Sequence, residues 1–350
     1  MTGNVISRFN VLRLILVFVL GAGFLVGSGG CTVTDRQVIS QAANVHKELE
    51  PAVIRDPVLA NYLQEVGDRI VRAAQELSRE GFGPKSHKSG EDTSWMYQDM
   101  QFHLVNSKTL NAFTTGGKHM YIYTELMQHC RTEDELAAVM AHEYAHVYAR
   151  HVKKGMERQY TMLGIAAGAG IAGAAAGYQA DDTEGALTYG SIAAGAALAA
   201  GQFIGMGYTR KDEDEADKLG FWFYCRAGWD PHQFAGFFQT LIDKGYDKTP
   251  EIMSDHPKLS HRVAATRGRI KQLPPDAERW RRPPVADPRR FAELKERAAR
   301  VGKSMPNDQS LQQAQLLLAA FPSCVTPEDQ PEQKRARSIV ARAIQQAKRK

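Results

Sequence analysis

The sequence predicts an α+β protein that is mostly helical, and three observations carry that prediction. Apolar residues recur at helical spacing along most of the chain. Strand character is confined to two short runs, at 102–105 and 120–123. A His-Glu-x-x-His sequence lies in a capped helical segment that begins near Thr132. The expected architecture is therefore a helical body with a small sheet.

Length and composition agree with a folded protein. The chain has 350 residues, and domains typically hold roughly 100–200, so about two domains are expected. A hydrophobic content of 43% excludes a disordered or collagen-like chain. The mean hydropathy of -0.38 excludes a polytopic membrane protein. The four cysteines are scattered and predict neither a disulfide framework nor a structural zinc site.

Residues 1–30 have the organisation of a secretory signal peptide. Two arginines precede the uncharged apolar segment 14–26. The following Ser28-Gly29-Gly30-Cys31 resembles a bacterial lipobox, with serine where leucine is usual. This resemblance implies lipidation of Cys31, and Thr32 after it favours the outer membrane by analogy with lipoprotein sorting. The alternative is an uncleaved anchor helix, for which the apolar segment is only just long enough.

Helices are predicted on both sides of the two strand-like runs. Before them, Asp56-Pro57 combines an N-cap residue with proline at the first helical position. Gly116-Gly117 predicts a turn between the runs. After them, Thr132 and Glu135 form a capping box that opens a helix through about His151.

Two Gly/Ala-rich segments, 161–178 and 185–207, follow that helix and contain no Lys or Arg. Their glycine pairs at G-x-x-x-G spacing favour close helix packing, so we expect a helical hairpin over 161–207. Its turn is the polar sequence at 179–182. Two interpretations remain open: a hairpin that enters the bilayer, or a buried or mobile hairpin over a cleft of the protein.

The C-terminal part is also predicted to be helical. Segments 209–226 and 230–244 carry helical patterns, and proline pairs between 274 and 284 mark a linker. Beyond it, residues 276–350 form a basic helical region. Its charges are not interleaved with aromatic residues and accompany no nucleic-acid-binding motif, so we expect no nucleic-acid partner.

The strongest chemical signal is His142-Glu143-Tyr144-Ala145-His146. Residues four apart share a helix face, so two neutral imidazoles can bind one zinc ion. Glu143 lies beside them, where a carboxylate can take a proton from a metal-bound water. The pattern therefore predicts catalytic Glu143 and metal ligands His142 and His146. Tyr144 is expected to point away from the metal.

A catalytic zinc needs a third protein ligand and one open position. The acidic run that follows Arg210 offers Glu213 and Asp217, which are four apart and face one way. One of these carboxylates can reach the metal while the other orients a ligand histidine. The alternative is an acidic, solvated helix face.

These motifs together resemble the CAAX-prenyl-protease-type zinc metallopeptidases, the family of HtpX, BepA and the Oma-type mitochondrial protease. The family's second motif is S-R-x-x-E-x-x-A-D, and residues 209–217 read T-R-K-D-E-D-E-A-D. The resemblance implies that Glu213, not Glu215, is the third ligand and that Asp217 supports a ligand. It covers roughly residues 35–270 and includes 111–117, which is similar to the family's entry into an edge strand.

The resemblance implies a gluzincin fold, with a small sheet beside the active-site helix and one Zn²⁺ per chain. The metallopeptidase domain is expected over 31–275. The strand near 119–124 would be the sheet edge and would bind extended substrate by strand addition. Its residues are His119, Met120, Tyr121, Ile122 and Tyr123.

The implied function is endopeptidase cleavage of misfolded or unassembled envelope polypeptides by a periplasm-facing lipoprotein of the bacterial cell envelope. The alternative is a chaperone or assembly factor for outer-membrane proteins with latent proteolysis. His256 precedes proline in a loop and could fill the open position of the zinc, or simply belong to a turn that caps a helix. His151 and His119 are expected to be ordinary surface or loop histidines.

Overall fold

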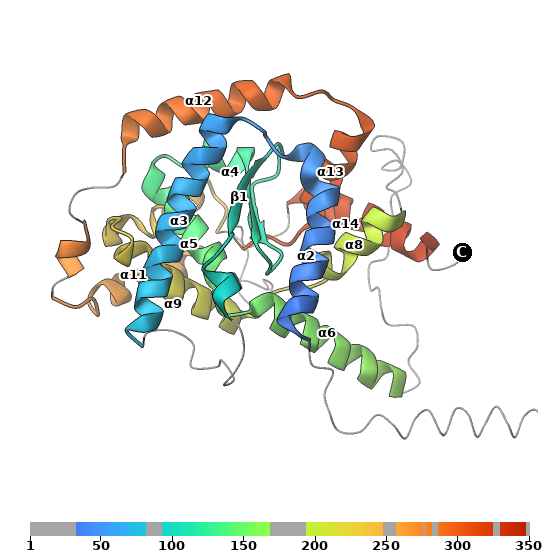
Figure 1. Cartoon of the computed structure of the whole chain (residues 1–350), viewed down its shortest axis with the longest axis horizontal. Helices are drawn as coiled ribbons and strands as arrows, with labels where there is room; N and C mark the ends of the chain where they lie inside the picture. The colour runs from blue at the N-terminus through green and yellow to red at the C-terminus, as the bar shows by residue number, and fades with distance from the viewer. Residues whose placement is uncertain are drawn as a thin grey trace, which may run out of the picture.

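The prediction of a mostly helical α+β protein is confirmed. The computed structural model shows helices surrounding a small sheet (Figure 1). The structure describes residues 33–81, 93–168, 194–247, 257–275, 277–281, 286–324 and 330–347.

The first two long helices begin at N-caps, of which the sequence indicated only the one at Asp56. Thr34 forms a capping box with Gln37. The Asp56 carboxylate accepts hydrogen bonds from the backbone N–H groups of Val58 and Leu59. These caps begin the two long helices that flank the sheet in Figure 1. The elements are α2 (Asp35–Leu49), the 3-10 helix η1 (Glu50–Ala52) and α3 (Pro57–Arg79).

The sheet has three strands in the order β1-β3-β2. β1 (Gln101–Val105) runs parallel to β3 (His119–Tyr123), and β2 (Ala112–Thr114) runs antiparallel to it. The expectation that 119–123 is the sheet edge is therefore wrong, because both sides of this strand are paired. β2 has only three residues, too few for a strand pattern to reveal it, and it is β2 that forms an edge. A 3-10 helix, η2 (Ser94–Met96), precedes the sheet.

The predicted metal-binding helix is the buried centre of the molecule. α5 (Glu133–Tyr148) is capped by the Thr132 hydroxyl, which accepts a hydrogen bond from the Glu135 N–H. It ends before the expected His151, because Arg150 adopts a left-handed φ of 57°. The chain then turns into a separate helix. The neighbouring helices are α4 (Thr124–His129) and α6 (His151–Gly168).

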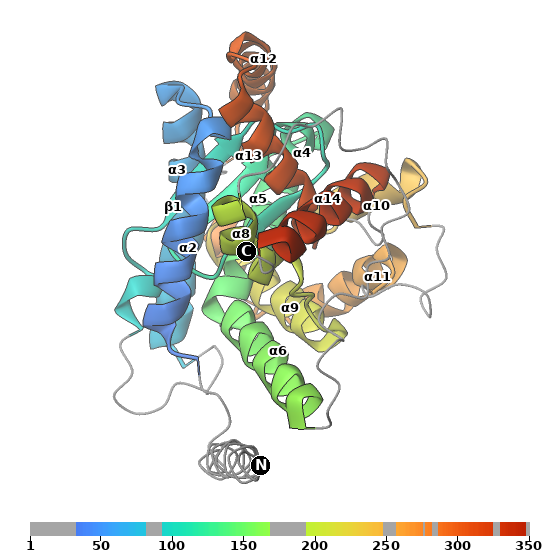
Figure 2. The same cartoon turned by 90° about the vertical axis from the view of Figure 1, so that its right-hand side faces the viewer.

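The Gly/Ala-rich hairpin is described only at its two ends. The connection that would contain its turn lies outside the described residues. α8 (Ala194–Ile204) packs against α14 (Pro331–Ala347) and α2, and Gly201 allows Ile344 of α14 to approach closely. Figure 2 shows α8 beside α14. Of the helices within the described ranges, none combines the length and apolar character needed to cross a membrane.

The chain after α8 supplies helices that cover α5 and the sheet. The elements are α9 (Arg210–Arg226), η3 (Pro231–Gln233), α10 (Gly236–Asp243), α11 (Leu259–Ile270), η5 (Ala277–Arg281), α12 (Pro288–Ser304) and α13 (Gln309–Ala320). α9 crosses α5, and α12 packs on α3 and α4 at the top of Figure 1. The predicted helix after Asp230 starts as the 3-10 turn η3.

Candidate metal centre

Two histidines of α5 converge on one point. His142 and His146 are one helical turn apart, and their Nε2 atoms lie 3.1 Å from each other. Both side chains are buried, as is Glu143 between them. Tyr144 leaves this face, and its hydroxyl donates to the carbonyl of Met96.

Glu213 reaches the same point from α9. Its carboxylate oxygens lie 3.5 Å from His142 Nε2 and 3.7 Å from His146 Nε2. This approach depends on Gly220, two turns further along the helix. A Cβ there would lie 2.9 Å from the Cα and backbone nitrogen of His142. Glycine therefore lets the two helices touch through their backbones.

The three donors fit a single metal ion. Donors bound tetrahedrally at about 2.0–2.2 Å are separated by about 3.3–3.6 Å. The observed separations of 3.1, 3.5 and 3.7 Å agree with that spacing. Two imidazoles and a carboxylate also match the donor set of catalytic zinc sites. His142, His146 and Glu213 are therefore suited to hold a divalent metal.

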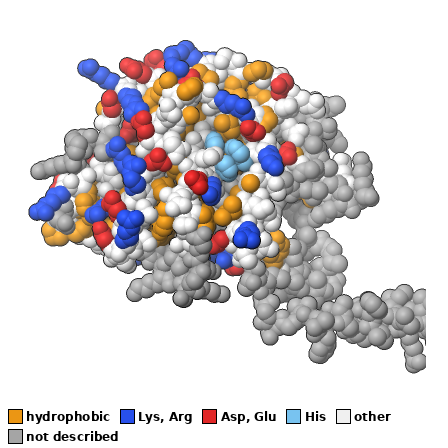
Figure 3. Space-filling view, viewed as in Figure 1, with side chains coloured by type: hydrophobic (Ala, Val, Ile, Leu, Met, Phe, Trp, Pro, Cys, Tyr) orange, Lys and Arg blue, Asp and Glu red, His pale blue; other side chains and the backbone are white. Residues whose placement is uncertain are grey.

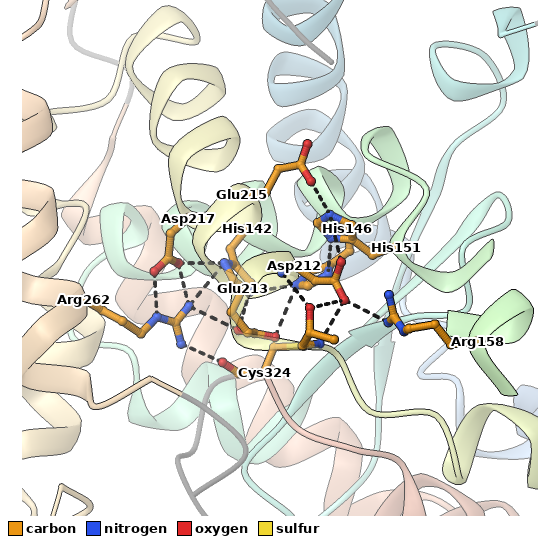
Figure 4. A network of polar contacts seen from close by, with 11 residues as sticks. His142, His146, His151, Arg158, Asp212, Glu213, Glu215, Asp217, Arg262 and Cys324 are labelled. Carbon is orange, nitrogen blue, oxygen red and sulfur yellow. Dashed lines mark hydrogen bonds and ion pairs between the residues drawn. The ribbon is translucent and has the colours of Figure 1, made fainter. Parts of the chain in front are cut away.

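A buried ion pair orients His142 (Figure 4). Asp217 Oδ1 lies 2.9 Å from His142 Nδ1, which leaves Nε2 for the metal. Arg262 of α11 donates from Nε and Nη2 to the two Asp217 oxygens, at 2.9 and 2.6 Å. Burial by itself would raise the pKa of Asp217, but the Arg262 charge and the hydrogen bonds hold it well below its usual range. Asp217 is therefore a fixed negative charge.

His146 is held by a second histidine and a tyrosine. His151 Nδ1 lies 2.9 Å from His146 Nδ1, and the Tyr208 ring stacks on His146 with centroids 3.9 Å apart. His151 Nε2 lies 3.0 Å from Glu215. The expectation that His151 is an ordinary surface histidine is wrong, because the turn at Arg150 directs it inward, where it is fully buried. Glu215 binds His151 and Lys154 rather than facing the metal donors.

Burial controls the charge of the candidate base. Desolvation raises the pKa of Glu143 to about 8, although the neighbouring His142 opposes the shift. Desolvation lowers the pKa of His142, but its hydrogen bonds with Asp217 and Glu213 outweigh this and raise the pKa to about 9.

Sequence reasoning missed three residues of this centre, Tyr208, Arg262 and Cys324. Arg262 is one of many arginines in a basic stretch, and no local pattern distinguishes it. Cys324 follows α13, yet its sulfur joins His142, His146 and Glu213 in a group whose ligand atoms all lie within 4.8 Å of one another. Cys324 lies far along the chain from the motifs, so no sequence pattern connects it with them. Cys31 and His256 lie outside the described residues.

The His-Glu-x-x-His helix crossed by a helix that supplies a glutamate is the arrangement of a metallopeptidase. The chain belongs to peptidase family M48, which matches residues 92–270 and so includes His142, Glu143, His146, Glu213 and Arg262 but not Cys324.

Three curated relatives illustrate the likeness. The chain is 29% identical over 256 residues to the beta-barrel assembly-enhancing protease of Escherichia coli, which covers 71% of this chain and 47% of that protein. The protease of the same name from Yersinia pestis is 28% identical over 257 residues, and the match covers 71% of this chain and 47% of that protein. The mitochondrial metalloendopeptidase OMA1 of Arabidopsis thaliana is 24% identical over 218 residues, and the match covers 60% of this chain and 39% of that protein. The chain spans less than half the length of each.

Proposed function

We propose that this protein is a zinc-dependent endopeptidase of the bacterial cell envelope. The observation that carries the proposal is the convergence of His142, His146 and Glu213 beside a buried carboxyl group, that of Glu143. A pure scaffold has no physical need for that combination. One Zn²⁺ per chain at this centre is part of the proposal.

The proposed chemistry assigns each side chain a role. A zinc ion bound here would polarise the scissile carbonyl and lower the pKa of a water molecule. Glu143 would accept a proton from the attacking water and pass it to the leaving amine. Asp217 keeps Nδ1 of His142 engaged, so that Nε2 faces the metal. Arg262 neutralises Asp217 and keeps its carboxylate in place.

The substrate proposal follows from the relatives and from the sheet. Two of the relatives are named for enhancing β-barrel assembly, and we extend this setting to misfolded or unassembled envelope polypeptides. An extended substrate would lie along β2, the sheet edge that packs on α5. Lipidation of Cys31 would tether the protein to the membrane, with the outer membrane favoured.

A second candidate is an assembly factor with latent proteolysis. One observation favours it: the metal donors and Glu143 are all buried in this structure. A peptide needs a conformational opening before it can reach them. Under this proposal, binding of an unfolded client would come first and cleavage would be conditional.

The test is cleavage of an unfolded β-barrel polypeptide by the zinc-loaded mature protein. Glu143→Gln should keep its zinc but cleave at least about a hundredfold more slowly, the usual loss of a general base. Glu65→Gln is the matched control, since Glu65 pairs with Arg290 on the surface. Equal cleavage by wild type and Glu143→Gln would refute the mechanism. Client binding without cleavage by zinc-loaded wild type would favour the assembly factor.

A further inference from the structure

A short segment of the C-terminal region reaches the metal centre. Residues 321–324 follow α13, and Cys324 is only 1% exposed. Its sulfur shares the 4.8 Å group with the ligand atoms of His142, His146 and Glu213. Figure 4 shows Cys324 next to Glu213 and Arg262.

Side chains from the core hold this segment in place. The Phe321 ring stacks on Phe113 of β2, with ring centroids 4.1 Å apart. Arg262 Nη1 donates to the carbonyl of Cys324 at 2.8 Å, while the same guanidinium binds Asp217. The arginine that supports the ligand His142 therefore also fixes the backbone of Cys324.

The segment also closes the centre. Both carboxylate oxygens of Glu143 are buried and receive no hydrogen bond from a nitrogen or oxygen donor of the described residues, while the Cys324 thiol interacts with this carboxylate. Asn111, which precedes β2, donates to the carbonyl of Pro322 at 3.2 Å. The chain from Phe321 to Cys324 thus lies against the sheet edge and the base that a substrate would need.

We propose that Cys324 is a fourth ligand of the catalytic metal and that residues 321–324 hold the peptidase latent. The inference rests on the proposed metal site at His142, His146 and Glu213. Zinc sites with four protein ligands are closed, whereas catalytic sites keep one position open for water. A thiolate in that position excludes water, and the attached segment excludes substrate. Peptidase activity then requires residues 321–324 to move away from the metal.

The ligand role is tested on the Co²⁺-substituted full chain. Wild type should show a thiolate-to-cobalt charge-transfer band in the near ultraviolet, and Cys324→Ser should lose it while keeping the metal content of wild type. Cys130→Ser is the matched control, because Cys130 is a buried free thiol outside the metal-ligand group. X-ray absorption of the zinc form should show one sulfur at about 2.3 Å.

The latency role is tested by cleavage of the unfolded polypeptide. Cys324→Ser should cleave at least about tenfold faster than wild type, as expected when about 1.4 kcal/mol of segment closure is lost. Phe321→Ala should also activate, because it loosens the segment without removing the ligand. This variant keeps the test decisive if Cys324→Ser does not fold.

The outcomes separate the two proposals. A metal equivalent that His142→Ala removes, bound in wild type without a thiolate band, would overturn the fourth ligand and leave the peptidase proposal intact. Unchanged cleavage by both Cys324→Ser and Phe321→Ala would overturn latency. Equal metal content in wild type and His142→Ala would instead refute the catalytic metal site itself.

A second histidine cluster carries an independent inference. His46 of α2, His103 of β1 and His119 of β3 bring one ligand nitrogen each within 4.8 Å of the others. His103 Nε2 lies 3.0 Å from His119 Nδ1, and the rings of His46 and His119 stack with centroids 3.9 Å apart. All three are partly exposed, and histidines are visible on the face shown in Figure 3.

We infer that these three histidines form a second site for a divalent transition metal, such as Zn²⁺, Cu²⁺ or Ni²⁺. Imidazole suits these ions, and the exposed face leaves room for water as a further ligand. The Glu50 carboxylate acts electrostatically on His46 but does not belong to the ligand group. The protein ligands of this site are therefore three imidazoles. A bound metal would tie α2 to the sheet.

Metal stoichiometry and thermal stability test this site. In a His142→Ala background, Zn²⁺ should still raise the melting temperature, and adding His103→Asn should abolish the shift. His232→Asn is the matched control, because His232 is exposed and outside the cluster. Wild type should bind two equivalents of Zn²⁺ and His103→Asn or His119→Gln one. Equal stoichiometry in wild type and both variants would overturn the inference.

Discussion

Gly220→Ala tests whether the contact between α5 and α9 sets the metal geometry. Gly220 lies on the face of α9 that carries Glu213 and Asp217. The added Cβ would lie 2.9 Å from His142 Cα and backbone nitrogen and 3.0 Å from the carbonyl carbon of Ala141. These are backbone atoms of a buried helix, so no flexible side chain can yield. The helices must move apart by roughly 0.5–1 Å to restore ordinary contact.

Two consequences can be sized. Overpacking a core costs about 1–3 kcal/mol, and alanine returns about 1 kcal/mol of helix propensity, so the net loss of stability is about 0–2 kcal/mol. The metal is more sensitive, because ligand distances in a working site vary by only about 0.2 Å. We expect metal affinity to fall about 10–100-fold, as for loss of a supporting residue.

The assay is a chelator-competition titration of metal affinity, with unfolding of the apoprotein measured in parallel. Gly268→Ala is the matched control, because Gly268 is a helical glycine of α11 and a Cβ there would meet no atom within 4 Å. It should gain up to about 1 kcal/mol of stability and leave metal affinity unchanged. A folded Gly220→Ala protein that binds metal within about twofold of wild type would refute the reasoning, because the expected loss is at least about tenfold.

Three further predictions concern stability. Arg262→Met leaves the buried Asp217 carboxylate with His142 but without its arginine partner. It should cost about 3–5 kcal/mol in urea unfolding, with partial recovery in the double variant that adds Asp217→Asn. No recovery would argue against the ion pair as the cause. Chelation of the metal should lower the unfolding free energy, by about 2.7 kcal/mol when free metal had been about 100 times the dissociation constant; a His142→Ala variant equally sensitive to the chelator would count against the catalytic site as the source. Burial raises the pKa of Glu133, which accepts hydrogen bonds from Tyr62 and Trp229. The native state therefore keeps this proton to higher pH than the unfolded state, so stability should fall as pH rises from about 4.5 through the raised pKa. Urea unfolding between about pH 4 and 8 should show a smaller fall in the unfolding free energy for Glu133→Gln than for wild type. Equal dependence of stability on pH in the two proteins would contradict the role given to Glu133.

Local signals in the sequence predicted much of this fold. Asp56 and Thr132 cap their helices as expected, because capping depends on residues within one turn. The expected capping box is only half formed, because the Glu135 carboxylate binds Arg131 instead of the Thr132 N–H. The strand at 119–123 was correctly expected as a strand but wrongly as an edge. Strand order depends on pairing between distant segments, and the short β2 carries too few residues to indicate that pairing.

In the candidate site, too, local spacing was predictable from the sequence and contacts between distant segments were not. By itself, the sequence determined which side chains share a helix face: His142 with His146, and Glu213 with Asp217, because residues four apart are neighbours on any α-helix. Only the tertiary structure decided that these two faces meet through Gly220 and that Arg262 neutralises Asp217. It also brought Cys324 to the metal donors. Contacts between segments far apart in the chain follow from how whole helices pack, and no spacing within one segment encodes them.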